Sequence, residues 1–141
     1  MPRAAKAAAT LAAFSLFTLS LIALSLAALS SAASAADGDL EIAFNDHCRE
    51  CHSFLKDDNR LGPSLYGVVG RKAGTEPGFA YSESLKSAGI TWTPENLDKW
   101  IKDPDAFIPG NDMSPPYPGI TDPAIRKQII AFLQTLAPKK N

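Results

Sequence analysis

The sequence has no basic stretch, no internal repeat and no pattern typical of a β-strand. Its 14 basic residues face 15 acidic ones. The first 36 residues hold two of the basic residues and none of the acidic ones, so the rest of the chain carries a net charge of −3. A mildly acidic body without a basic patch argues against nucleic acid as a partner. The lack of strand patterns predicts an all-α fold, and the chain length allows a single domain.

Cysteine is scarce, since Cys48 and Cys51 are the only two in the chain. A disulfide between them would close a loop too short to stabilise a whole domain. We therefore expect these two residues to serve chemistry rather than stability.

The N-terminal segment lacks acidic residues and is typical of an export signal. Arg3 and Lys6 precede an uncharged run at residues 7–36 that is rich in Ala, Leu and Ser and ends in small residues suited to signal peptidase. This predicts a signal peptide at residues 1–36 and one exported domain at residues 37–141, located in the periplasm. The run also exceeds the roughly 20 residues that span a bilayer, so an uncleaved membrane anchor is the alternative.

Three short helices are predicted in the body. The first covers Asp39–Asp46, where apolar residues recur at helical spacing. The second begins at Thr93-Pro94, a capping residue followed by proline, and stops before Pro104. The third opens at Asp122-Pro123 and ends at Ala137-Pro138.

Glycine and proline concentrate in residues 54–91, which are predicted to be loops with few fixed elements, while six prolines predict an irregular loop at residues 103–123. Three short helices supply little apolar volume for this much chain. This predicts that an apolar prosthetic group fills the middle of the domain.

The segment Cys48–His52 has the pattern C-x-x-C-H, for which three sites compete. A thioredoxin-like pair needs a preceding strand, whereas a helix is predicted here. A zinc site needs about four ligands, and including His47 would crowd all four into six consecutive residues. In c-type haem attachment, the Cys48 and Cys51 thiols bond to the two haem vinyl groups and His52 binds the iron, which suits both the spacing and the predicted export.

A second axial ligand follows by elimination. His47 lies beside the attachment motif and does not reach the opposite face of a haem, and Met1 leaves with the signal. Met113 is the remaining methionine, so we expect it to be the distal ligand rather than a methionine that only packs on the core. Thioether ligation favours Fe(II), and two filled axial positions leave no site for oxygen or peroxide, which predicts electron transfer rather than catalysis.

Two other functions stay open from the residues alone. A peroxidase or gas-binding haem protein would require Met113 to leave the iron, and the chain offers no distal histidine to assist. A thiol oxidoreductase would use Cys48 and Cys51 without haem, and such a protein would be colourless.

Residues from about Leu40 to Leu136 resemble the class I cytochromes c, specifically the mitochondrial-like soluble type of bacteria. The matching segments are Cys48–His52, Leu61–Gly67, Gly70–Gly74, Pro77–Ser82, Gly89–Trp92 and Phe107–Met113. The resemblance implies a small all-α fold of three to five short helices and long loops wrapped around one covalently bound haem c. It also implies a monomeric one-electron carrier, not an enzyme, that exchanges electrons with redox partner proteins and meets membranes only through them or through an uncleaved N-terminal segment.

The resemblance assigns roles to further residues. The Pro63 carbonyl is expected to accept a hydrogen bond from His52 Nδ1–H, and Phe44 is expected to meet Phe132–Leu136 where the first and last helices cross. The other haem-pocket residues that it implies are Arg71, Tyr81 and Trp92, which would hold a propionate, together with Trp100 and Asn111.

The chain departs from the family pattern at several positions. Trp100 stands where many relatives have a tyrosine, and Leu40 stands where they have a glycine at the helix crossing. Asp105, Asp112 and Asp122 occupy haem-edge positions where mitochondrial relatives display lysines. Our hypothesis is that the partner's docking surface is neutral, apolar or basic rather than acidic.

Overall fold

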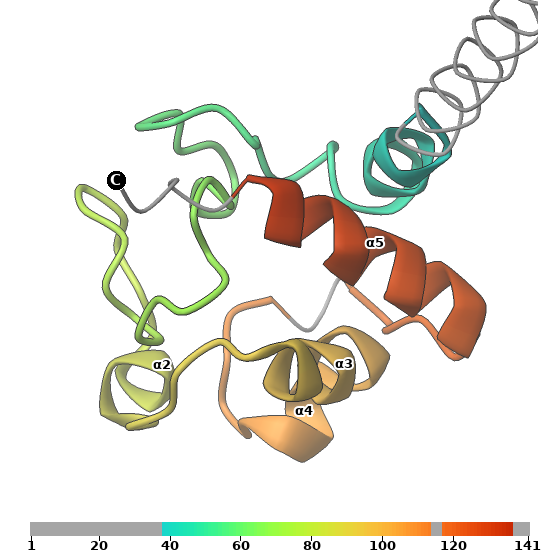
Figure 1. The fold of residues 1–141 in the computed structure, drawn as a ribbon. Coiled ribbons are helices and arrows are strands. Elements are labelled where there is room, and N and C mark those ends of the chain that lie inside the picture. The colour runs from blue at the N-terminus through green and yellow to red at the C-terminus, as the bar shows by residue number, and fades with distance from the viewer. Residues whose placement is uncertain (1–37, 114–116, 137–141) are drawn as a thin grey trace, which may run out of the picture. The chain divides into compact units, whose positions relative to one another are not determined.

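The computed structural model describes residues 38–113 and 117–136, so the predicted export signal lies outside the described residues. The helices are residues 38–47, α2 (Glu83–Ser87), α3 (Pro94–Lys102), α4 (Pro104–Phe107) and α5 (Pro123–Thr135) (Figure 1). Within these ranges the only β-pairing is an isolated bridge between Lys72 and Thr91, so the all-α prediction is confirmed. None of the helices described is both long and apolar enough to cross a membrane.

The three predicted helices are present. For the second and third of them, α3 and α5, the capping residues explain where each helix begins. In α3 the Thr93 side chain accepts a hydrogen bond from the Asn96 N–H at 3.2 Å, and Pro94 occupies the first helical position. In α5 the Asp122 side chain accepts from the Ala124 N–H at 2.7 Å. A cap of this kind satisfies a backbone donor that has no partner inside the helix.

Two further short helices, α2 and α4, bring the number within the described residues to five, in the expected range of three to five. α2 is one of the few fixed elements expected in residues 54–91, whereas α4 lies where an irregular loop was predicted, so that prediction was wrong for Pro104–Phe107. Ser82 caps α2 by accepting from the Leu85 N–H at 3.4 Å, and Asp103 caps α4 by accepting from the Ala106 N–H at 3.0 Å. Pro104 ends α3 because it cannot continue that helix, yet it begins α4, where its missing N–H needs no partner.

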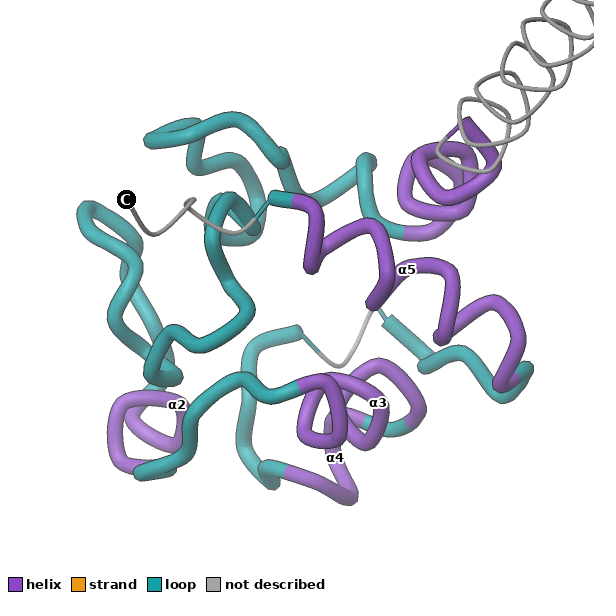
Figure 2. Tube along the Cα trace, in the orientation of Figure 1, coloured by secondary structure: helices purple, strands orange, loops and turns teal. Residues whose placement is uncertain are grey.

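The core forms where the first and last helices cross, as predicted. Phe44, on helix 38–47, and Ile129, on α5, are both fully buried. The Phe44 and Phe132 ring centroids lie 5.2 Å apart, and the Phe54 ring lies 5.5 Å from each of them. Figure 2 shows that the chain between this first helix and α3 is mostly loop, interrupted by α2. The loops of this segment therefore depend on the helices for their support.

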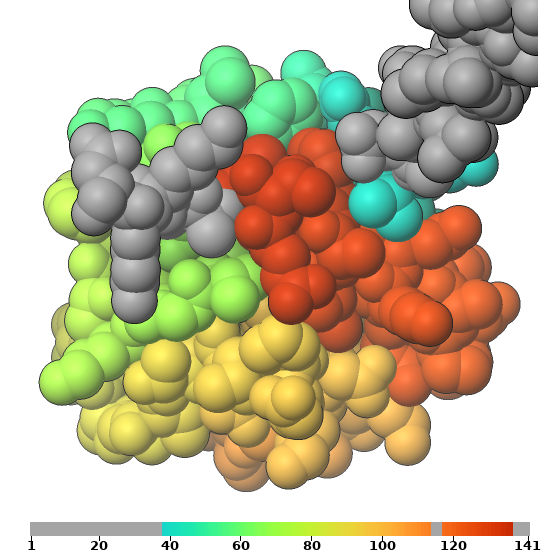
Figure 3. Space-filling view, in the orientation of Figure 1, coloured from blue at the N-terminus to red at the C-terminus, as the bar shows by residue number. Residues whose placement is uncertain are grey.

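A buried arginine on α5 holds α3 and α5 together. Arg126 donates from Nε to the Asp98 carboxylate at 2.7 Å and from Nη1 to the carbonyls of Ile120 at 3.0 Å and Thr121 at 2.8 Å. The pairing of Nε and Nη1 offsets the cost of burying this charged side chain, which is only 6% exposed. Figure 3 shows the α5 side chains in red directly above those of α3 in yellow.

Candidate functional site

The attachment motif forms one turn directly after helix 38–47. The Cys48 N–H donates to the Phe44 carbonyl at 2.8 Å, and the Cys48 carbonyl accepts from the N–H groups of Cys51 at 3.2 Å and His52 at 2.9 Å. Both thiols are free. Burial, and to a lesser extent the neighbouring Cys51, raises the pKa of Cys48 to about 12. The Cys48 thiol is therefore held in its protonated form at neutral pH.

His52 is held from two sides. Its Nδ1 lies 2.8 Å from the Pro63 carbonyl, which can only accept, so Nδ1 carries the proton and the Nε2 lone pair is available to a metal. The ring lies against Gly62, where an added Cβ would come within 2.6 Å of Nδ1 and 2.8 Å of Nε2. Burial lowers the pKa of His52, against the opposing effect of the Pro63 hydrogen bond, and so favours the neutral ligand.

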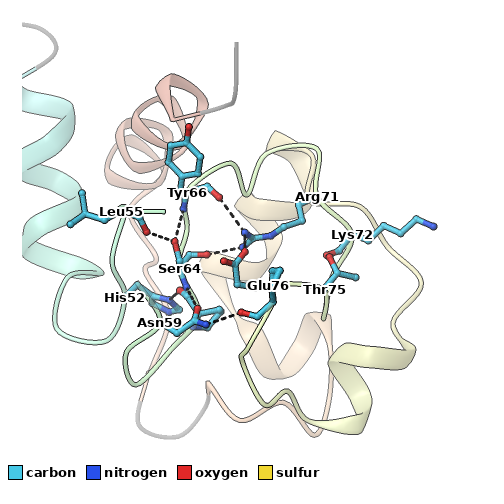
Figure 4. A network of polar contacts seen from close by, with 11 residues as sticks. His52, Leu55, Asn59, Ser64, Tyr66, Arg71, Lys72, Thr75 and Glu76 are labelled. Carbon is cyan, nitrogen blue, oxygen red and sulfur yellow. Dashed lines mark hydrogen bonds and ion pairs between the residues drawn. The ribbon is translucent and has the colours of Figure 1, made fainter. Parts of the chain in front are cut away.

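Arg71 is the centre of a buried polar network (Figure 4). Its Nη1 donates to the Tyr66 carbonyl at 3.2 Å and to the Glu76 carboxylate, and its Nη2 donates to the Ser64 carbonyl at 2.8 Å. Its Nε is buried and has no hydrogen-bond partner within the described part of the chain. A buried donor of a cation needs an acceptor, and a haem propionate is an acceptor of the right kind.

The loop that follows the histidine is fixed by Ser64, which the sequence did not single out. Ser64 is fully buried, its Oγ donates to the Leu55 carbonyl at 2.6 Å, and its N–H donates to Asn59 Oδ1 at 2.9 Å. The Asn59 amide in turn donates to the Pro77 carbonyl at 2.9 Å. These bonds set the position of the adjacent Pro63 carbonyl and hence of the imidazole that it faces (Figure 4).

Two of the predicted pocket residues, Tyr81 and Trp92, lie beside Arg71. The Trp92 N–H donates to the Arg71 carbonyl at 2.9 Å, and Trp92 is buried. Burial raises the pKa of Tyr81, and the nearby Arg71 charge opposes that shift. Trp100 extends the group, because its ring centroid lies 5.4 Å from that of Trp92.

Met113 lies on the loop after α4, half-buried and packed against the core. Its N–H donates to Asn111 Oδ1 at 2.9 Å, and its carbonyl accepts from the Tyr117 N–H at 3.1 Å. The buried Asn111 amide donates to Asp105 Oδ1 and to the Ile108 carbonyl, both at 3.0 Å. The backbone of the expected distal ligand is thus held on both sides.

Two free thiols separated by one turn, a neutral imidazole with an available Nε2, and a buried cationic donor that lacks an acceptor among the described residues fit a covalently attached haem. The fold and the site define a small all-α protein of the c-type haem class. The family described as "Cytochrome c" matches residues 41–137, and the chain belongs to the cytochrome c family.

Individual relatives agree with this assignment. Cytochrome c2 of Rhodopila globiformis is 50% identical over 93 residues, which cover 66% of this chain and 86% of that protein. The structure of cytochrome cH from Methylobacterium extorquens matches with a TM-score of 0.62 at 43% identity, covering 72% of this chain and 96% of that one. Cytochrome c2 from Rhodospirillum centenum matches with a TM-score of 0.65 at 32% identity, covering 72% and 98%.

Membership of this family confirms several predictions. The protein is an electron carrier rather than an enzyme, it carries one covalent haem c, and redox proteins are its partners. Cys48 and Cys51 fit the haem attachment site.

Proposed function

We propose that the protein carries single electrons on a haem iron held axially by His52 and Met113. The observation that supports this most directly is the imidazole held between the Pro63 carbonyl and Gly62, which leaves Nε2 to the metal. Met113 supplies the thioether, on a loop whose backbone is hydrogen-bonded on both sides. Bound haem supplies an iron that alternates between Fe(II) and Fe(III), and two protein ligands keep small molecules away from it.

The surrounding residues would set how readily the iron is reduced. Donation from His52 Nδ1–H to Pro63 increases the basicity of the imidazole and favours Fe(III). Burial of the site and thioether ligation by Met113 favour Fe(II). Arg71, with Tyr81 and Trp92 beside it, would hold a propionate through the Nε donor that lacks a partner within residues 38–113 and 117–136. These residues bind, orient and exclude water, while the redox change stays on the cofactor.

We further propose that residues 1–36 direct export to the periplasm, where the haem is attached. The carrier would work there as a monomer, because each transfer needs only a brief encounter between one haem and one partner. It would meet membranes through its partners, or through residues 1–36 if they are not removed.

An optical spectrum of the oxidised, periplasmically matured protein tests the ligation. We expect the weak far-red sulfur-to-iron charge-transfer band in the native protein and its loss in Met113→Ala. His47→Ala, a substitution at an exposed residue outside the ligand pair, is the control and should keep the band. A haem spectrum without the band in the native protein would contradict Met113 ligation and favour an open iron suited to peroxide or gases.

A further inference from the structure

The haem-edge acid Asp105 does not simply face solvent, because it is hydrogen-bonded to Asn111. The Asn111 side chain is only 6% exposed, and its amide nitrogen donates to Asp105 Oδ1 and to the Ile108 carbonyl, both at 3.0 Å. Both acceptors lack a proton to give, so the amide can have only one orientation, with its oxygen toward the Met113 N–H at 2.9 Å. The chain of contacts therefore runs from a carboxylate to the backbone of Met113.

The two acceptors of Asn111 are not equivalent. The Ile108 carbonyl is neutral and belongs to the C-cap residue of α4, whose N–H donates to the Pro104 carbonyl at 2.9 Å. Asp105 belongs to α4, whose first turn is fixed by the Asp103 cap and by the fully buried Pro104. Both acceptors therefore tie Asn111 to α4, and the negative charge of Asp105 makes its hydrogen bond the stronger of the two.

We propose that Asp105 is a positioning residue for the distal iron ligand. Through Asn111 it restrains the backbone of Met113 and so limits how often the thioether leaves the iron. This inference rests on the proposed ligation by Met113. It also separates Asp105 from the partner-docking role that its place at the haem edge suggested.

Competition by imidazole for the iron of the ferric holoprotein measures release of Met113, with loss of the far-red band as the signal. We expect Asp105→Ala to raise the imidazole association constant about three- to tenfold, a range consistent with loss of one charge-assisted hydrogen bond at a partly exposed site. Asp105→Asn keeps an acceptor oxygen but loses the charge, so its effect should be smaller than that of Asp105→Ala. Asp112→Asn, which removes an exposed charge beside Met113, is the matched control and should change the constant less than twofold.

A double-mutant cycle tests whether Asp105 acts through Asn111. In an Asn111→Ala background, Asp105→Ala should have no further effect on the association constant. An effect that persists there would overturn the inference, as would equal effects of Asp105→Ala and Asp112→Asn, or none from Asp105→Ala. If Asp105→Ala does not mature with haem, Asp105→Ser, too short to reach the amide, takes its place. Absence of the far-red band from the native protein would instead refute the ligation itself, so the two failures are distinguishable.

Discussion

Gly62 is the residue on which the orientation of the proximal histidine depends most directly. An alanine Cβ at this position would lie 2.6 Å from His52 Nδ1 and 2.8 Å from Nε2, closer than atoms in contact can approach. The imidazole is buried and hydrogen-bonded to Pro63, so it has no free space into which to turn. Gly62→Ala must therefore displace either the ring or the backbone that carries Pro63.

The expected loss in the free energy of unfolding has two sources, overpacking around the imidazole and loss of its hydrogen bond. Overpacking a buried site costs about 1–3 kcal/mol, and loss of the hydrogen bond to Pro63 adds about 1 kcal/mol. The smaller entropy of the unfolded alanine chain returns about 0.4–1 kcal/mol. We expect Gly62→Ala to lower the free energy of unfolding by about 2 kcal/mol. The reduction potential should rise as well, because an imidazole that loses its acceptor is a weaker donor to Fe(III).

Guanidinium unfolding of the ferric holoprotein and a redox titration measure the two effects. Gly38→Ala is the matched control, because a Cβ there meets nothing within 4 Å and alanine suits a helix, so the free energy of unfolding should not fall and the reduction potential should not change. A Gly62→Ala protein with the native midpoint of unfolding and the native potential would refute the account of how His52 is held.

Two further predictions concern a tyrosine and a surface charge. Tyr117 donates from its hydroxyl to the Ile101 carbonyl at 3.0 Å, so Tyr117→Phe should lower the free energy of unfolding at pH 7 by about 1 kcal/mol. Burial raises the pKa of Tyr117, so above pH 10 the phenol ionises in the unfolded chain first, and the native protein loses stability that Tyr117→Phe does not lose. In guanidinium unfolding, the free energies of unfolding of the two proteins should therefore converge as the pH rises. A difference that stays constant with pH would contradict this. Asp112→Lys should speed oxidation by anionic ferricyanide and slow oxidation by a cationic cobalt complex, each about twofold at low salt, with both effects vanishing at high salt. Unchanged rates would place Asp112 away from the electron-transfer edge.

Local chemistry made part of this molecule predictable from sequence. The first residues of α3 and α5 are set by a local signal, a capping side chain followed by proline. Both helices begin at the residues that this signal predicts. The shorter α2 and α4 have caps as well, Ser82 and Asp103, but lie within segments dense in glycine and proline. A single helical turn cannot be predicted from such composition, because its stability comes from packing rather than from its own helix propensity.

The functional site likewise has one part that the sequence predicts and another part that it does not. Cys48–His52 is contiguous, so its chemistry can be predicted from the spacing of its residues alone. The support around it joins loop residues outside this run, such as Asn59 with Pro77, 18 residues apart, and Arg71 with Glu76, five residues apart. No periodicity or composition marks such pairs. Ser64 and Glu76 therefore emerge only once the loops are folded, although each polar contact is ordinary once its partner is known.

The acidic haem edge shows how the fold changes the meaning of a charge. Three aspartates at positions where relatives have lysines suggested one altered docking surface, yet two of them accept hydrogen bonds within the domain. Asp122 caps α5, and Asp105 accepts a hydrogen bond from Asn111. A carboxylate that already accepts a hydrogen bond within the domain is weaker evidence for a partner, because its presence has an explanation inside the molecule. The docking hypothesis therefore depends on Asp112, and substitution of Asp105 would confound loss of a charge with loosening of the loop that carries Met113.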